Sequence, residues 1–462
     1  MTSWTPTLAS DRPRYIAIAD AIAADLAAGR LKSGERLPPQ RDLAWKLGVT
    51  VGTITRAYQE AGKRGLLSGE VGRGSFLRDP SASLTGVKNI FRGTETAMLD
   101  LQMAAPPRVH LQAEFESALD EIGRDPGFED LLDYPPAGGF RQHQEMGSRW
   151  LARAGLEVPP DRVVVSAGAQ ACLVSCLSAL TSPGDGLLIE PLTYPTMRPI
   201  ARQLGLALRP LEADEEGIIP DSVEALAKNG KGRLVYLVPT LHNPTTVTLS
   251  RPRREAIAEI ADRYGLTIVE DDVFRYLADR PPVTLCSLAP ERTYYIQSVS
   301  KTMAAGLRVG FMALPPGSGV DIVRQQMIIG GRPVSLALEV ARRWIESDIA
   351  ERILGAIRAE LLARRKLALE VLAGHSLQCA PGAMYVWLAL PAHWRASEFA
   401  AAAQTSGLKL TPGTAFAMNH ASPDKVRVCL GPAPSQDSLR AGLERLRKVL
   451  EASPAEEFQT MA

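Results

Sequence analysis

Residues 298–311 read SVSKTMAAGLRVGF, and this stretch contains a single lysine, Lys301. Its pattern predicts a strand that ends before a turn, followed by a second strand that opens at Leu307. Lys301 then lies in the turn, where a side chain leaves the sheet and can meet a ligand. The stretch therefore predicts a strand–turn–strand unit that presents one amine at its end.

Polar side chains flank this lysine on both sides. Ser298 and Ser300 supply two hydroxyls and Arg308 supplies a guanidinium, a set that suits a phosphate. A lysine amine beside a phosphate site indicates a Schiff base to pyridoxal phosphate. A surface lysine in a polar turn explains so short a match equally well, so the rest of the chain has to decide.

Short apolar strands alternate with helical patterns from about Leu99 onward. The strands read RVVVSAG, GLLIEPL, RLVYLVP, LTIVEDD, TYYIQSVS and VGFMALP. This alternation predicts an α/β fold whose sheet is mostly parallel and covered by helices on both faces. Ligands bind such sheets at the carboxyl ends of the strands, so the polar residues found there are candidates for one site.

Four strand ends carry residues that suit a pyridine ring with a phosphate arm. Gly168 opens a helix, whose first N–H groups favour a phosphate. Tyr194 can stack on the ring, Asn243 can bond its phenolic oxygen, and Asp271 can keep its nitrogen protonated. Each has an ordinary alternative: a strand–helix connection, a core tyrosine, an Asn-Pro turn or a solvated strand end.

The order of these motifs resembles the class I, fold type I pyridoxal-phosphate aminotransferases over roughly residues 98–452, with a smaller C-terminal α/β subdomain at about 330–452. The resemblance implies that Lys301 forms the internal aldimine and Asp271 faces the pyridine nitrogen. It implies a homodimer with active sites at the interface, in which Tyr134 reaches the partner's phosphate, and it gives Arg427 an effector's carboxylate to bind. The further cofactor contacts that it implies are Gly168, Ala169, Gln170, Tyr194, Asn243, Ser298, Ser300 and Arg308.

The chain departs from this family at two places. Val273 and Phe274 stand where the family usually has a tyrosine bonded to the phenolic oxygen, and Thr246 follows Thr245 where a glycine is usual. Loss of the tyrosine hydroxyl leaves a cofactor that binds but is poorly tuned for transamination. We therefore expect transaminase activity to be weak or absent.

The first part of the chain has the pattern of a winged helix. An apolar helical run, YIAIADAIAADLAAG, precedes a short helix at residues 41–47. Gly48 permits a tight turn, and Thr50 can cap a helix that runs to about Lys63. The following LLSGEVGRGSFL places two short strands around a basic hairpin tip, which is typical of a wing.

The run from Gly29 to Ala44 and the GRGSF wing resemble the GntR family of winged-helix regulators. Val51 and Gly52 stand where that family usually has an arginine, so base reading falls to the residues around them. A small helical domain used for protein contacts is the alternative. The residues expected to contact a double-stranded DNA operator are Arg41, Thr50, Thr53, Thr55, Arg56 and Arg73.

Charge and cysteine content narrow the class of protein. Residues 1–80 hold 12 Lys/Arg and 8 Asp/Glu, a balance of +4, while the rest hold 40 and 43, a balance of −3. The total of +1 argues against a wholly basic nucleic-acid binder. The five cysteines show no metal spacing, and we expect Cys172 and Cys176 to be core thiols.

The N-terminus has no signal-peptide pattern, and no apolar run reaches about 18 residues. We therefore expect a bacterial-type cytoplasmic protein that contacts no membrane and is nucleoid-associated when bound to DNA.

A winged helix at 1–78, a linker at 79–97, an aminotransferase-like module at 98–452 and a tail at 453–462 together resemble MocR-type transcriptional regulators. The resemblance implies that an amino-acid or amine effector displaces Lys301, forms an external aldimine and alters how two winged helices meet paired half-sites. An active aminotransferase is the main alternative, and it predicts sustained keto-acid turnover. A DNA-binding protein with an empty aminotransferase-like fold is a third interpretation.

Overall fold

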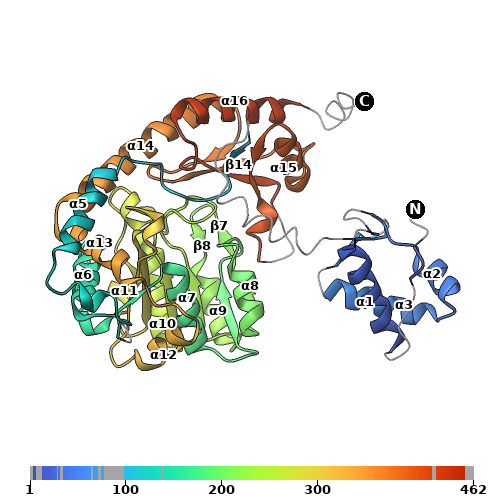
Figure 1. Ribbon diagram of the computed structural model, residues 1–462, viewed down its shortest axis with the longest axis horizontal. Coiled ribbons are helices and arrows are strands. Elements are labelled where there is room, and N and C mark those ends of the chain that lie inside the picture. Colours follow the sequence, from blue (N-terminus) through green and yellow to red (C-terminus); the bar gives the residue numbers. More distant parts are fainter. Residues whose placement is uncertain are drawn as a thin grey trace. The chain divides into compact units, whose positions relative to one another are not determined.

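The computed structural model describes residues 4–6, 13–28, 30–31, 35–63, 66–70, 74–77, 98–136, 139–418 and 423–452. These residues belong to two compact units, which divide between Thr96 and Ala97 (Figure 1). The expected linker at 79–97, the tail at 453–462 and Arg73 lie outside the described residues.

The N-terminal unit consists of α1 (Arg14–Ala27), α2 (Gln40–Leu47), α3 (Val51–Lys63) and the antiparallel strands β1 (Leu67–Glu70) and β2 (Gly74–Leu77). Gly48 ends α2 with a φ of 61°, the left-handed conformation that glycine adopts without a steric cost. The Thr53 N–H donates to the Thr50 hydroxyl at 3.2 Å. The turn and the cap that the sequence predicts are therefore present. Ile18, Ile22 and Ile54 are fully buried in the small core between the helices.

The second unit is built on a seven-stranded sheet. Its strands lie in the order β4 (Val163–Ser166), β12 (Gly310–Ala313), β11 (Thr293–Ser298), β10 (Thr267–Asp271), β9 (Leu234–Leu237), β5 (Gly186–Ile189) and β6 (Ala207–Pro210). Every neighbouring pair is parallel except the two that contain β12. The mostly parallel sheet that the sequence predicts is confirmed, and its carboxyl edge gathers residues far apart in the chain.

Helices cover both faces of this sheet (Figure 1). Val235 and Leu237 pack in one apolar cluster with α9 (Pro220–Lys228), α10 (Arg251–Tyr264) and α11 (Leu285–Leu288). Tyr236 points to the other face, since neighbouring strand residues alternate in direction. That face packs with α5 (Gln112–Gly123), α6 (Arg141–Ala152), α7 (Ala169–Leu180), α8 (Met197–Leu204), α12 (Val320–Ile328) and α13 (Ser335–Glu346).

A smaller antiparallel sheet follows in the order β13 (Leu377–Gln378), β14 (Tyr385–Ala389), β17 (Lys425–Cys429) and β16 (Thr411–Pro412). Three helices accompany it: α14 (Ile349–Val371), α15 (Ala396–Thr405) and α16 (Gln436–Glu451). Helix α14 extends from α13 to α16 and so connects the two sheets (Figure 1). A separate two-stranded sheet pairs β15 (Leu408–Lys409) in parallel with β3 (Leu99–Asp100), the first strand of the second unit.

The second strand of the Lys301 unit begins later than the sequence predicts. Residues Ala305–Leu307 form a 3-10 turn, Arg308 is left-handed with a φ of 52°, and β12 opens only at Gly310. A Cβ at Gly310 would lie 2.5 Å from the Gly168 carbonyl carbon. The chain therefore turns sharply before Gly310 and then runs closely past the Gly168 loop.

All five cysteines are free and buried, which confirms Cys172 and Cys176 as core thiols. Within the described residues, no helix is long and apolar enough to cross a membrane, and no acidic, histidine or cysteine cluster could hold a metal ion.

Candidate functional site

A cavity of about 550 Å³ lies at the carboxyl edge of the large sheet, against the small subdomain. Most of the predicted site residues line it: Ala169, Gln170, Tyr194, Asn243, Asp271, Ser298, Ser300, Lys301, Arg308 and Arg427. Gly168 lies next to the Arg308 guanidinium. Tyr134 lines no part of this cavity and is 93% exposed.

Lys301 projects into the cavity from the end of β11. Its Nζ donates to the Ala104 carbonyl at 2.5 Å and lies 5.8 Å from the centre of the Phe274 ring. Burial, together with the positive charge of Arg427, lowers the pKa of Lys301 to about 8. The amine is therefore neutral in a useful fraction of molecules near neutral pH, as a nucleophile must be.

Asp271 ends β10 and presents one satisfied and one unsatisfied oxygen. Oδ2 accepts a hydrogen bond from the Tyr236 hydroxyl at 2.8 Å, whereas Oδ1 is buried without a partner. Burial raises the pKa of Asp271 to about 6, although the Tyr236 hydroxyl opposes the rise. A buried carboxylate oxygen without a donor is costly in itself, and a ring N–H of a ligand is the kind of group that satisfies it.

A guanidinium and two hydroxyls gather at the start of α7. The Arg308 guanidinium donates to the Ala167 carbonyl at 3.2 Å, and a Cβ at Gly168 would lie 2.7 Å from one of its nitrogens. Gly168 has a φ of 93°, a left-handed conformation that favours glycine. The Ser298 hydroxyl donates to that of Ser300 at 2.9 Å. A helix start, two hydroxyls and a guanidinium fit a phosphate.

Arg427 on β17 closes the opposite side of the cavity and is almost fully buried. It donates to the Asn243 side-chain oxygen at 2.7 Å and to the Gln102 carbonyl, while its Nε has no partner. The Phe416 ring lies 4.8 Å from its guanidinium carbon. Since the Asn243 oxygen accepts this bond, the Asn243 amide nitrogen is the atom available to a ligand oxygen.

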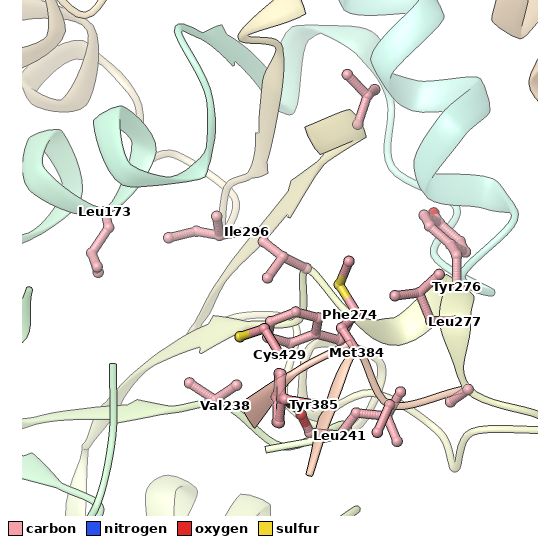
Figure 2. Packing of buried hydrophobic residues seen from close by; sticks show 14 of the residues in the cluster. Leu173, Val238, Leu241, Phe274, Tyr276, Leu277, Ile296, Met384, Tyr385 and Cys429 are labelled. Atoms are coloured by element: carbon pink, nitrogen blue, oxygen red, sulfur yellow. Dashed lines mark hydrogen bonds between the residues drawn. The ribbon is translucent and has the colours of Figure 1, made fainter. Parts of the chain in front are cut away.

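The wall next to Lys301 is aromatic but carries no hydroxyl at residues 273 and 274. Phe274 meets Tyr385 edge-on, with the ring centres 5.8 Å apart (Figure 2). The Tyr385 hydroxyl donates to the Leu241 carbonyl at 2.6 Å. The Tyr194 hydroxyl donates to Gln170 at 3.1 Å. The hydroxyl whose absence the sequence indicates is therefore not replaced by Tyr385, which is engaged with the backbone.

Some of the side chains predicted to contact DNA are exposed, and others make contacts within the N-terminal unit. Arg41 on α2 is exposed, whereas Thr50 and Thr53 bond each other at 2.9 Å. Thr55 donates to the Gln40 side chain at 2.7 Å, and Arg56 stacks 4.5 Å above the Tyr15 ring. Thr55 therefore holds α2 against α3 in this structure, besides any contact it makes to DNA.

The groups that sequence reasoning missed include one side chain and two backbone carbonyls that bond to predicted site residues. Tyr236 lies on β9, opposite Val269, and its only signal is a hydroxyl in an otherwise apolar strand next to β10. The other two are the backbone carbonyls of Gln102 and Ala104, for which the sequence has no signal.

Comparison with known proteins places both units in families. The model for aminotransferase class I and II matches residues 110–446, and that for bacterial regulatory proteins of the gntR family matches residues 14–77. The predicted combination of a GntR-type domain and an aminotransferase-type domain is confirmed.

Three curated relatives have a similar length. The uncharacterized HTH-type transcriptional regulator YdeF of Bacillus subtilis is 29% identical and covers 97% of each chain. The vitamin B6 salvage pathway transcriptional repressor PtsJ of Salmonella typhimurium is 26% identical over 87% of this chain and 91% of its own. The probable rhizopine catabolism regulatory protein MocR of Rhizobium meliloti is 25% identical over 72% and 71%.

The crystal structure of LysN, an alpha-aminoadipate aminotransferase from Thermus thermophilus complexed with N-(5'-phosphopyridoxyl)-L-leucine, superposes with a TM-score of 0.72. It is 23% identical and covers 79% of this chain and 94% of its own, a likeness that shows the fold.

Proposed function

The chain belongs to the aminotransferase class I and II family and carries a GntR-family domain, and from this premise we propose that it is a pyridoxal-phosphate-dependent transcriptional regulator. It binds an operator through the N-terminal unit and senses an amino-group metabolite at Lys301. The observation that carries the proposal is the pairing of the Lys301 amine with the unsatisfied Asp271 Oδ1 in one cavity.

The residues present fit this cofactor. Lys301 would carry it, Asp271 would accept the ring N–H, and the Gly168 loop with Ser300 and Arg308 would hold the phosphate. When bound, the group supplies an aldehyde carbon at which one amine can replace another. Lys301 would hold that carbon, and its side chain would become a free amine where an effector amine takes its place.

Phe274 favours sensing over turnover. Amine exchange needs only Lys301 and an anchor such as Arg427. Transamination also needs proton transfer at the effector's alpha carbon, aligned over the ring, and small errors in that alignment are costly. Val273 and Phe274 line the cavity without a hydroxyl, so neither can hold the cofactor's ring in place by a hydrogen bond. An active aminotransferase is the second candidate, because Lys301, Asp271 and Arg427 all line the cavity.

We also propose that the regulator is a homodimer in which Tyr134 reaches the partner's phosphate site. Tyr134 is 93% exposed, so its ring is accessible to a partner subunit. A separate apolar groove of about 630 Å³ lies on α5 and α13, with Phe115 and Leu336 in its lining, and a second copy of the chain would cover it. A two-fold dimer would present two winged helices to paired half-sites.

Purified protein loaded with pyridoxal phosphate tests the function. We expect its aldimine absorption band to shift with the effector from a panel of amino acids and amines, and operator affinity to change over the same concentration range. Keto acid released over many cycles at about 1 per second or more, with operator binding indifferent to the effector, would support the aminotransferase instead.

A further inference from the structure

Tyr236 lies on β9 with its ring fully buried and its hydroxyl next to Asp271 on the neighbouring strand. Its partner in the parallel register of β9 and β10 is Val269, so the hydroxyl reaches diagonally to the end of β10. There it donates to Asp271 Oδ2 at 2.8 Å. Asp271 lines the ligand cavity, whereas Tyr236 does not. Tyr236 can therefore act on a ligand only through Asp271.

This hydrogen bond makes the two carboxylate oxygens of Asp271 unequal. Oδ2 is held by Tyr236, and Oδ1 is buried without a partner among the residues that the structure describes. A side chain that is anchored by a neighbour's hydrogen bond keeps its remaining atoms in a fixed direction. Oδ1 is therefore the oxygen that remains for a ring N–H.

The same bond affects the ionisation of Asp271. Burial raises the pKa of Asp271 to about 6, and the Tyr236 hydroxyl opposes the rise because it stabilises the charged carboxylate. Only the ionised carboxylate is purely an acceptor, since the protonated form carries an O–H donor. The other titratable groups that act on Asp271 or feel its charge are Asp272, Lys301, Cys172 and Tyr385.

A second tyrosine forms a similar pair on the other side of β10. Tyr295 on β11 is fully buried, and its hydroxyl donates to Asp272 Oδ2 at 3.3 Å. Neither Tyr295 nor Asp272 lines the cavity. Two buried tyrosines thus support two consecutive carboxylates, and only the pair of Tyr236 and Asp271 adjoins the ligand.

We propose that Tyr236 is a positioning residue for the cofactor, which through Asp271 Oδ2 directs Oδ1 at the ring N–H and keeps the carboxylate an acceptor. This role rests on the proposed function. It makes Tyr236 the residue that sets the lower pH limit at which the regulator retains its cofactor.

Pyridoxine 5'-phosphate tests this role in the cofactor-free, full-length protein, because it has the ring nitrogen and the phosphate but no aldehyde to react with Lys301. Its affinity for the native chain should fall as pH drops through about 6, where Asp271 takes up a proton. In Tyr236→Phe the fall should begin about one pH unit higher, the worth of a hydrogen bond to a charged group. The ratio of the two dissociation constants should therefore be about tenfold below pH 6 and shrink toward about pH 9.

Tyr295→Phe is the matched control, since it removes an equally buried hydroxyl from the neighbouring carboxylate. Its dissociation constant should follow that of the native chain at every pH. A ratio for Tyr236→Phe that does not vary with pH, or that Tyr295→Phe reproduces, would make Tyr236 a packing residue and overturn the positioning role. Absence of an aldimine band when the native chain meets pyridoxal phosphate would instead overturn the proposed function, and the positioning role with it.

Replacement of Tyr236 by 3-fluorotyrosine covers the case in which Tyr236→Phe does not fold. This residue keeps the hydroxyl and nearly the same size but is a stronger hydrogen-bond donor. It should therefore stabilise the ionised carboxylate further and move the fall in affinity to lower pH. No movement, or a movement to higher pH, would contradict the positioning role.

Discussion

Burial acts in opposite directions on the two ionisable side chains at the centre of the site. It lowers the pKa of Lys301 to about 8 and raises that of Asp271 to about 6. Both shifts favour the neutral form of the group. The neutral Lys301 amine is the form that adds to an aldehyde, whereas Asp271 has to be ionised to accept a ring N–H. The shifted pKa of each residue can be tested separately.

The reactivity of Lys301 should follow its lowered pKa. Addition to pyridoxal phosphate requires the neutral amine, so the rate of adduct formation in cofactor-free protein should rise with pH and level off above about 8, rather than near the 10.5 of an ordinary lysine. Borohydride trapping at a series of pH values measures this rate. Lys301→Ala should form no trapped adduct, and Lys366→Ala, at an exposed site, should behave as the native chain. A midpoint near 10 would contradict the assignment.

Replacement of Asp271 by asparagine should stabilise the cofactor-free protein at high pH. A folded-state pKa of about 6, above the ordinary 3.8, means that the stability tied to protonated Asp271 is complete below pH 3.8 and is lost as pH rises through 6. We expect Asp271→Asn to raise the unfolding free energy by on the order of 1–3 kcal/mol at pH 8 and by little at pH 4. Denaturant unfolding at both pH values measures this. An equal change in unfolding free energy at pH 4 and pH 8 would refute this prediction. Asp271→Asn should also bind the cofactor more weakly.

At the scale of elements, α3, which we propose reads the bases, has no arginine at its start. Val51 is 43% exposed, and a Cβ at Gly52 would make only an ordinary contact with the Thr50 hydroxyl at 3.8 Å. The hydroxyls of Thr50, Thr53 and Thr55 are engaged in hydrogen bonds within the protein. A contact to the phosphate backbone is therefore missing at a place where a long cationic side chain fits.

Val51→Arg should strengthen DNA binding in a salt-dependent way. One added phosphate contact should steepen the slope of log affinity against log salt by about 0.9. Titrations with an operator fragment at several salt concentrations give that slope. Val320→Arg, at a 79% exposed position in the second unit, is the control for added charge alone. The same slope in both variants would show that α3 does not face the DNA backbone.

The sequence predicted those parts of the site that are local in the chain or follow from strand ends. Ser298, Ser300, Lys301 and Arg308 lie within one turn and its flanks, so their spacing alone brings them together. The sequence does not predict Tyr236, because its contact with Asp271 depends on the register of two strands. It does not predict the contacts of the Gln102 and Ala104 carbonyls, because every residue has a carbonyl. The late start of β12 depends on Gly310 meeting Gly168, a long-range contact.

At the scale of the whole molecule, the exposed Tyr134 makes the proposed dimer testable by complementation. Tyr134→Ala and Lys301→Ala should each weaken cofactor retention, since each removes one contact from every site. In a mixture unfolded and refolded together, mixed dimers contain one site with both residues, so about one quarter of all sites should be restored. Retained absorbance after dialysis measures this. No recovery, with dimers present by light scattering, would place Tyr134 outside the partner's site.

The burial of all five thiols has a practical consequence for watching this regulator respond. Cys172 and Cys286 have pKa values raised to about 12 by burial, and the pKa of Cys429 is raised for the same reason. Because the native thiols are buried and their raised pKa values disfavour the thiolate, maleimide should label exposed, newly introduced cysteines first. Two new cysteines, one at exposed Trp45 and one at exposed Leu362, can then carry a donor and an acceptor dye. Energy transfer between them would report in real time whether an effector changes the distance from the winged helix to the ligand-binding body.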